Sequence, residues 1–139
     1  INSQWTFTST LNIQQGREEM DDRSSSPSRH APPTYGLSRL NYKKNKWQLS
    51  FHSQYAAGFS FDQLPLEERG KPELYAIDEN GNPYSPAWTI WGLSGQYDLK
   101  PWLALNCGLE NLGNIRYRPY SSGIAGAGRN FFFSINARF

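Results

Sequence analysis

The stretch that most constrains the fold of this chain is its last one, which reads R-N-F-F-F-S-I-N-A-R-F over residues 129–139. Every second side chain from Phe131 to Phe139 is apolar and polar side chains stand between them, with Phe132 as the one break. Successive side chains of a β-strand point to opposite faces, so this alternation predicts a strand with one apolar and one polar face. The apolar face must meet either a protein core or lipid.

Five earlier stretches alternate in the same way, and no stretch shows the period of a helix. The sequence therefore predicts an all-β chain, an antiparallel meander of about six strands. We expect the strands at about residues 5–15, 34–42, 46–55, 87–97, 102–112 and 129–139. Long polar connections lie at 16–33, 56–86 and 113–128, and the other connections are short turns. All long loops then lie at one end of the sheet.

The composition excludes several classes of protein. Hydrophobic residues make up only 37% of the chain and aromatic residues 15%, and valine is absent, which is unusual for a compact soluble core. A net charge of +2 is too small to indicate a nucleic-acid partner. Cys107 is the only cysteine, so no disulfide framework can form. No apolar run is long enough for a membrane helix, and no signal peptide is recognisable.

The aromatic residues fall near the ends of the expected strands. Tyr55 and Trp88 fall at the long-loop end. The larger group falls at the short-turn end and consists of Trp5, Tyr42, Trp47, Tyr97, Trp102 and Phe139. Two aromatic girdles, short turns at one end and long loops at the other are typical of outer-membrane β-barrels. Strands of this length, tilted by about 45°, also cover the roughly 25 Å apolar band of such barrels.

The same sequence resembles the carboxy-terminal end of TonB-dependent outer-membrane receptors, in the style of Bacteroidetes members. The segment from Leu105 to Phe139 carries most of the likeness, with G-L-E-N-L-G-N-I-R-Y-R-P-Y-S-S-G followed by G-R-N-F-F-F-S-I-N-A-R-F. H-A-P-P-T-Y-G from His30 to Gly36 and N-G-N-P-Y-S-P-A-W from Asn80 to Trp88 are similar to loop-to-strand junctions of that family. The resemblance implies the last six strands of a 22-stranded barrel, without its plug domain.

The resemblance also implies partners and a cellular place. It implies a Gram-negative outer membrane, with the lipid bilayer and lipopolysaccharide around the barrel. The remaining strands and the plug would complete the receptor, and the TonB system would act through that missing plug. Phe139 would be the terminal aromatic that the barrel-assembly machinery recognises. The implied function is energised import of a metal chelate, a vitamin or a glycan, with no enzymatic step and no cofactor.

Candidate ligand contacts lie in the last long loop. Arginine favours planar anions, so the arginines of this loop predict contacts to an anionic ligand, or else to loop acids or lipopolysaccharide. The candidate contacts are Arg116, Tyr117, Arg118, Tyr120 and Arg129, with Tyr75 and Tyr84 as further possibilities. A calcium ion between acidic loop residues is the weaker reading of Glu18, Glu19, Asp21, Asp22, Asp78 and Glu79, so we predict no metal site.

Two alternatives remain open at this point. The first is a soluble β-sandwich that binds carbohydrate, in which exposed Trp and Tyr side chains stack on sugars. The second is a structural subunit of a composite outer-membrane barrel. Six strands are too few to close a membrane barrel, so both edges of the sheet need partners. The sequence names neither those partners nor the transported ligand, and it leaves open whether the chain is a fragment or a separate subunit.

Overall fold

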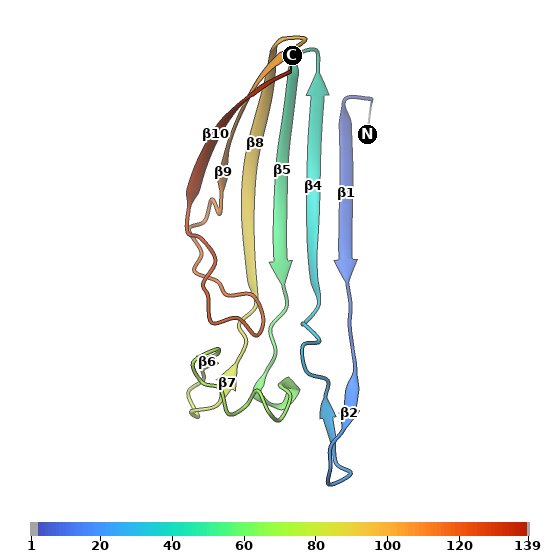
Figure 1. The fold of residues 1–139 in the computed structure, drawn as a ribbon, viewed down its shortest axis with the longest axis vertical. Helices are drawn as coiled ribbons and strands as arrows, with labels where there is room; N and C mark the ends of the chain where they lie inside the picture. The colour runs from blue at the N-terminus through green and yellow to red at the C-terminus, as the bar shows by residue number, and fades with distance from the viewer. Residues whose placement is uncertain (1–2, 139) are drawn as a thin grey trace.

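The computed structural model describes residues 3–138 and shows one six-stranded antiparallel sheet with strand order β1-β4-β5-β8-β9-β10 (Figure 1). Consecutive strands of the sheet are neighbours, so the predicted all-β meander is confirmed. The strands of the sheet are β1 (Trp5–Asn12), β4 (Tyr35–Lys44), β5 (Trp47–Ala56), β8 (Trp88–Lys100), β9 (Leu103–Glu110) and β10 (Asn130–Ala137). Among residues 3–138, no helix is long and apolar enough to cross a membrane.

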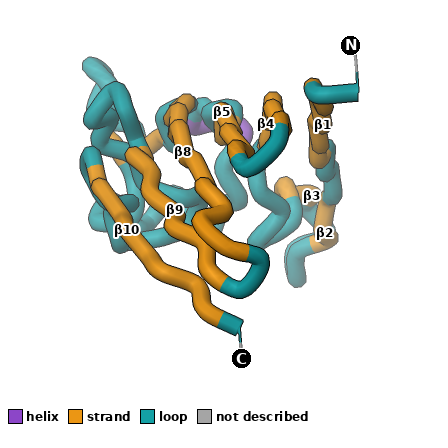
Figure 2. Tube along the Cα trace, turned by 90° about the horizontal axis from the view of Figure 1, so that it is seen from above, coloured by secondary structure: helices purple, strands orange, loops and turns teal. Residues whose placement is uncertain are grey.

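Seen along the strands, the sheet follows an open arc with β1 and β10 at its two ends (Figure 2). Across the part of the chain that the structure describes, each strand of the sheet contacts chiefly its sheet neighbours, and no second large sheet packs on either face. A β-sandwich needs two stacked sheets, so this architecture is not that of a sandwich. Both outer strands keep an unpaired edge, which is the expected form of a piece of a barrel wall.

Two prolines explain why the first strand is shorter than its sequence pattern. Asn12 pairs with Tyr35, and a longer ladder would have to run past Thr34 into Pro32 and Pro33. Proline has no N–H to donate and cannot continue a ladder. Strand β1 therefore ends at Asn12 although the alternation continues to about residue 15.

Strand β8 is longer than its pattern because it contains a bulge. The register shifts between Asp98 and Lys100, and β8 then pairs again with Leu103 of β9. One extra residue in one strand breaks the period of two, so the alternation fades where the strand continues. Strand β9 ends at Glu110, because the next residue, Asn111, has a φ of +48° that leaves the extended conformation.

The long connections contain short elements that alternation does not predict. They are β2 (Arg17–Glu19), β3 (Ser25–Pro27), the 3-10 helix η1 (Phe61–Gln63), β6 (Ala76–Ile77) and β7 (Pro83–Tyr84). Strands β2 and β3 form a hairpin that extends beyond the rest of the loops in Figure 1. Between β6 and β7, Gly81 has a φ of +84° and donates its N–H to the carbonyl of Asp78. Asn80 and Gly81 thus form the kind of turn for which an Asn-Gly pair is typical.

One face of the sheet, here called the apolar face, carries hydrophobic side chains from all six strands. Phe51 pairs with Leu40 and Leu93, and Leu93 pairs with Leu109, which stands opposite Phe131. These side chains remain largely uncovered, and Phe131 is 64% exposed. A continuous uncovered apolar surface of this size marks a contact with lipid or with another protein.

The aromatic residues at the short-turn end form cross-strand pairs. Trp5 contacts Tyr42 with ring centroids 4.7 Å apart, and Trp47 contacts Tyr97 at 4.5 Å. Trp5 pairs with Tyr42, and Tyr42 pairs with Leu49 on β5. The aromatic residue of β5 is Trp47, which lies two residues nearer to the short-turn end than Leu49. The belt thus shifts by about one residue for each strand crossed. From strand spacings of about 4.8 Å and a rise of about 3.3 Å, this belt is level only if the strands tilt by roughly 35°.

The opposite face, here called the polar face, carries Thr, Gln, Asn and charged side chains. On it, His52 of β5 and Glu110 of β9 meet across β8, with Nε2 and Oε2 3.0 Å apart. A Cβ atom on Gly92, which lies between them, would come within 2.3 Å of the His52 ring. Glycine at this position leaves room for the pair.

Phe132, the residue that breaks the alternation, also lies on the polar face. A Cβ atom on Gly108 would come within 2.5 Å of the Phe132 ring. The ring therefore covers the space that the missing side chain of Gly108 leaves on the neighbouring strand. The break in the pattern is a packing contact within the sheet.

Candidate functional site

The loop layer, formed by the three long connections 13–34, 57–87 and 111–129, contains nearly all of the most deeply buried residues that the structure describes. Leu64 is 0% exposed and Glu68 1%, whereas the strands of the sheet bury few side chains completely. Ser26, Tyr75 and Asn111 are also buried. The packed core of this chain therefore lies in the loops and not on the sheet.

The first and second loops are joined by a hydroxyl and an ion pair. The hydroxyl oxygen of buried Ser26 accepts a hydrogen bond from the backbone N–H of Leu66 at 3.1 Å. Arg29 reaches across to Glu67 at 2.9 Å and also contacts Glu18 of its own loop at 3.3 Å. Exposed ion pairs contribute little to stability, so the hydrogen bond to buried Ser26 contributes more to holding these two loops together.

The second and third loops meet at the carboxylate of Glu68. Lys71 and Tyr75 donate hydrogen bonds to it at 2.9 and 2.8 Å, and the hydroxyl of Ser121 from the third loop lies at 3.4 Å. Tyr120 packs edge-on against Phe59, with ring centroids 5.3 Å apart. These contacts hold residues from two loops more than 40 positions apart in the sequence in one unit.

The hydrogen bonds around Glu68 decide its protonation. Burial, the largest single influence, raises the pKa of the Glu68 carboxyl, but the bonds from Lys71, Tyr75 and Ser121 together outweigh it. The pKa of Glu68 therefore lies below its usual value of 4.5. Burial first, and then the bond to Glu68, raise the pKa of the Tyr75 hydroxyl, so Tyr75 remains a donor.

This arrangement predicts a loss of loop-layer stability in acid. Because the pKa of Glu68 is lower in the folded state than in the unfolded state, its contribution is complete above pH 4.5 and is lost as the pH falls through the depressed value. Hydrogen exchange of loop amides, measured from neutral pH to acid, should show this opening. In the Glu68→Gln variant the loops should open more readily at neutral pH and depend less on pH, and an unchanged acid profile would contradict the role of Glu68.

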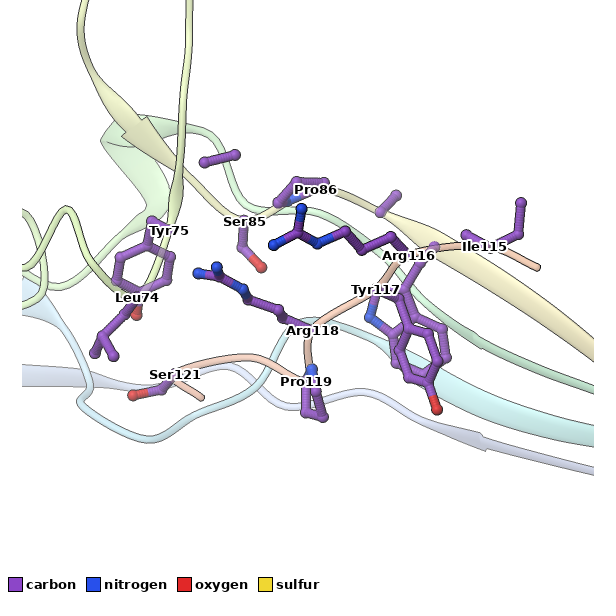
Figure 3. Close-up of a pocket in the computed structure, with 13 residues that line it drawn as sticks. Leu74, Tyr75, Ser85, Pro86, Ile115, Arg116, Tyr117, Arg118, Pro119 and Ser121 are labelled. Carbon is purple, nitrogen blue, oxygen red and sulfur yellow. The ribbon is translucent and has the colours of Figure 1, made fainter. Parts of the chain in front are cut away.

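A cavity of about 360 Å³ opens between the second and third loops, at the end of β8. Arg116 and Arg118 line it, and in Figure 3 both side chains point from the third loop toward Ser85. Arg118 donates one hydrogen bond to the backbone carbonyl of Glu73 at 3.0 Å. Among residues 3–138, no carboxylate forms an ion pair with either arginine. The cavity therefore presents two positive charges that a bound anion could neutralise.

An aromatic pair forms another part of the cavity wall. Trp88 and Tyr117 contact each other with ring centroids 4.6 Å apart, and both line the cavity. The sequence placed Trp88 in a lipid-facing girdle, and this was wrong. Trp88 shares the polar side of β8 with Ile90 and Gly92, where the third loop covers it. The position of an aromatic residue at a strand end does not decide its face, and the alternation along β8 puts Trp88 on the side away from Trp91 and Leu93.

The structure brings only part of the predicted contact set to the cavity. Arg116, Tyr117, Arg118 and Tyr75 line it, whereas Tyr120 packs behind it against Phe59 and Tyr75. Tyr84 and Arg129 are not among the lining residues. Contributions that sequence reasoning did not anticipate come from Leu74, Ala76, Ser85, Pro86, Ala87, Trp88, Ile115, Pro119 and Ser121.

Arg129 instead fixes the neck of the third loop. Its guanidinium donates two hydrogen bonds to the carbonyl of Leu112, at 3.1 and 2.8 Å. Next to it, the side chain of buried Asn111 donates to the carbonyls of Ile115 and Ala127 and accepts from the N–H of Ile115. The Asn-Leu-Gly-Asn stretch and Arg129 thus close the loop where it leaves the sheet.

The acidic loop residues are used locally. Glu18 pairs with Arg29, Asp22 accepts from the N–H of Ser24, and Asp78 accepts from the N–H groups of Asn80 and Asn82. No group of three or more His, Cys, Asp or Glu side chains within residues 3–138 is arranged to hold a metal ion. Phe139, the predicted assembly signal, lies outside the described residues.

No protein-family model and no curated protein match this chain. Solved structures do match it, among them two transporters and a siderophore receptor. The copper transporter OprC is 17% identical over 99% of the chain with a TM-score of 0.74. The ferric citrate transporter FecA is 22% identical over 79% with a TM-score of 0.58, and the siderophore receptor PiuA from Acinetobacter baumannii is 14% identical over 99% with a TM-score of 0.60.

The chain spans 21%, 17% and 20% of the lengths of these three proteins. Identities this low concern the fold alone. The fold of this chain is therefore that of a segment of the β-barrel wall found in these TonB-dependent proteins.

Proposed function

We propose that this chain is the carboxy-terminal part of the barrel of a TonB-dependent outer-membrane receptor, which imports a scarce nutrient into a Gram-negative cell. The observation that carries the proposal is the aromatic belt of the apolar face. Its shift of about one residue per strand corresponds to a tilt of roughly 35°, which membrane barrels have. The likeness to transporters of copper and ferric citrate and to a siderophore receptor supports the same function.

Depth-dependent fluorescence quenching tests this proposal. The chain would be reconstituted into vesicles whose lipids carry bromine either near the headgroup or near the middle of the acyl chain. Trp47 and Trp102 are 53% and 50% exposed, so lipid quenchers can contact both side chains. Because interfacial tryptophans lie at headgroup level, the shallow quencher should reduce their fluorescence more than the deep one. A chain that stays monomeric in plain buffer and unfolds cooperatively there would overturn the proposal and favour a soluble binding protein.

In the proposed receptor, the loop cavity contributes contacts to an anionic nutrient such as a metal chelate. Two arginines without a carboxylate partner attract a multiply charged anion, and the Trp88–Tyr117 pair offers an apolar wall. A neutral glycan would use the aromatic pair without needing the arginines. The charge on the ligand therefore separates the two nutrient classes.

Replacing both Arg116 and Arg118 by Gln is expected to weaken binding of an anionic chelate by at least about tenfold, since each lost charged hydrogen bond costs roughly 1.5 kcal/mol or more. Ferric citrate is a suitable probe and a neutral oligosaccharide the comparison, with affinity measured by calorimetry on the detergent-solubilised chain. Arg17→Gln and Arg23→Gln, on the separate β2–β3 hairpin, form the matched control. Tighter binding of the oligosaccharide, unaffected by the arginine changes, would favour a glycan.

The further partners follow from the same proposal. The open edges of β1 and β10 pair with the remaining strands of the barrel, and the polar face lines an interior that holds a plug domain. The TonB system acts through that plug, lipopolysaccharide surrounds the loop end, and the barrel-assembly machinery recognises Phe139. Deleting Phe139 from the expressed receptor and measuring its level in the outer membrane tests the last of these.

A further inference from the structure

Basic side chains gather at the short-turn end of the sheet, opposite the loop layer. Lys46, Lys100 and Arg138 line a cavity of about 500 Å³ there. The other lining residues include Gln48, Gln96 and Asp98 as well as Pro101, Trp102 and Leu103. Asp98 is the only carboxylate among the lining residues that the structure describes, and it already accepts a hydrogen bond from Gln96 at 2.7 Å. Three cations thus face one acid.

None of these cations has a carboxylate partner within residues 3–138. The basic side chains in ion pairs are Arg29, His52 and Lys71, and all three lie elsewhere. Lys46 has only a long contact of 3.5 Å from Nζ to the carbonyl of Leu99. Among the described residues, positive charge at this end therefore exceeds negative charge, and it attracts negative groups.

A second observation lies one row further along the polar face. The side-chain Nδ2 of Asn106 is buried and has no hydrogen-bond partner. Asn106 lines the adjacent cavity of about 620 Å³, to which Lys43 also contributes. A buried N–H group without an acceptor costs free energy, so this donor favours a partner that brings a carbonyl or carboxylate oxygen.

We propose that this basic end, defined by Lys46, Lys100 and Arg138, binds an acidic stretch of polypeptide, with Asn106 donating a hydrogen bond to it. The carboxylates of the partner pair with the three cations. Most of the side chains that line the cavity, such as Gln48, Gln96 and Asn136, lie on the polar face, although Trp102 and Leu103 also line it. This placement favours a polypeptide over a lipid headgroup. Lys44, opposite Trp47, is a cation at the same end on the apolar face. The site is separate from the loop cavity and does not depend on the ligand proposed there.

Fluorescence anisotropy with a labelled peptide of alternating Glu and Gly tests this proposal on the whole chain in a zwitterionic detergent, with a Gln-Gly peptide as the uncharged comparison. The acidic peptide should bind more tightly, and its affinity should fall as salt is raised from about 50 to about 500 mM. The triple variant Lys46→Gln, Lys100→Gln, Arg138→Gln should lose about tenfold in affinity, as expected for three exposed ion pairs.

Two further variants make the test specific. Lys44→Gln removes a cation at the same end but on the apolar face, and it should leave the affinity unchanged. Asn106→Ala should weaken peptide binding by about threefold, since one hydrogen bond is lost. The circular dichroism of every variant should match that of the parent chain, because the three replaced cations are exposed.

The proposal is overturned if the Glu and Gln peptides bind equally, or if the triple variant binds the acidic peptide as tightly as the parent chain. It is also overturned if vesicles containing phosphatidylglycerol, and not the peptide, distinguish the parent chain from the triple variant. That outcome would assign the basic end to a lipid surface.

Discussion

Replacing Leu93 by Arg is expected to destabilise the membrane-inserted sheet by about 2–4 kcal/mol, the cost of Arg on the lipid face near the bilayer midplane. Leu93 lies on the apolar face four residues from Tyr97 in the aromatic belt. At about 3.3 Å per residue and a tilt of roughly 35°, it stands about 11 Å above the belt, near the middle of a band of about 25 Å. Urea unfolding from phospholipid vesicles, followed by tryptophan fluorescence, measures this cost.

The matched control is Ser94→Arg. Ser94 is the next residue along β8, and its side chain lies on the polar face among Ser50, Gln96 and Asn106. An arginine there remains in contact with water or polar groups, so its cost should be well below that of Leu93→Arg. Equal costs at the two positions would mean that the apolar face does not meet lipid.

Asn111→Ala is expected to destabilise the neck of the third loop by about 4 kcal/mol. The change removes three hydrogen bonds at about 1 kcal/mol each, and alanine at positive φ adds roughly 1 kcal/mol. The Asn111 side chain is 2% exposed, so water cannot readily replace these bonds. Hydrogen exchange of the Ile115 amide, which donates to Asn111 at 2.9 Å, reports the loss directly.

Two variants separate the contributions at this position. Asn111→Gly loses the same hydrogen bonds but tolerates the φ of +48°, so it should be less harmful than Asn111→Ala by about 1 kcal/mol. Asn80→Ala changes an exposed asparagine in the turn between β6 and β7 and should leave the third loop unaffected. Unchanged exchange of the Ile115 amide in Asn111→Ala would show that other contacts hold the neck.

The sheet could be predicted from the sequence because each strand has one apolar and one polar face, and this period depends only on local geometry. The strand ends were less accurate, because two prolines that precede the partner strand end the ladder of β1, and a bulge extends β8. Phe132 looked like an irregularity because its partner, Gly108, is more than 20 positions away. Only the strand register shows that Phe132 stands opposite Gly108, whose lack of a side chain leaves space for the Phe132 ring.

The candidate site was less predictable. Arg116, Tyr117 and Arg118 are adjacent in the sequence and stand out by type, and they do line the cavity. Tyr120 and Arg129 are equally conspicuous, yet they pack behind the cavity and at the loop neck. Ser85, Trp88 and Ser121 reach the cavity only because two loops fold against each other around Glu68. No local pattern encodes such a contact.

Leu64, Glu68 and Tyr75 are buried in a loop and not in a strand. The positions that tolerate substitution should therefore be distributed differently from those of most globular proteins. In most globular proteins, loops accept substitutions and strand interiors do not. In the proposed membrane setting, an apolar strand position such as Leu109 or Ile135 needs only to remain hydrophobic, since lipid adapts to any such side chain. The loops, in contrast, contain side chains whose size and hydrogen bonds are matched to particular partners. Random mutagenesis should therefore find the least tolerated positions among residues 57–87 and 111–129, within the connections between strands.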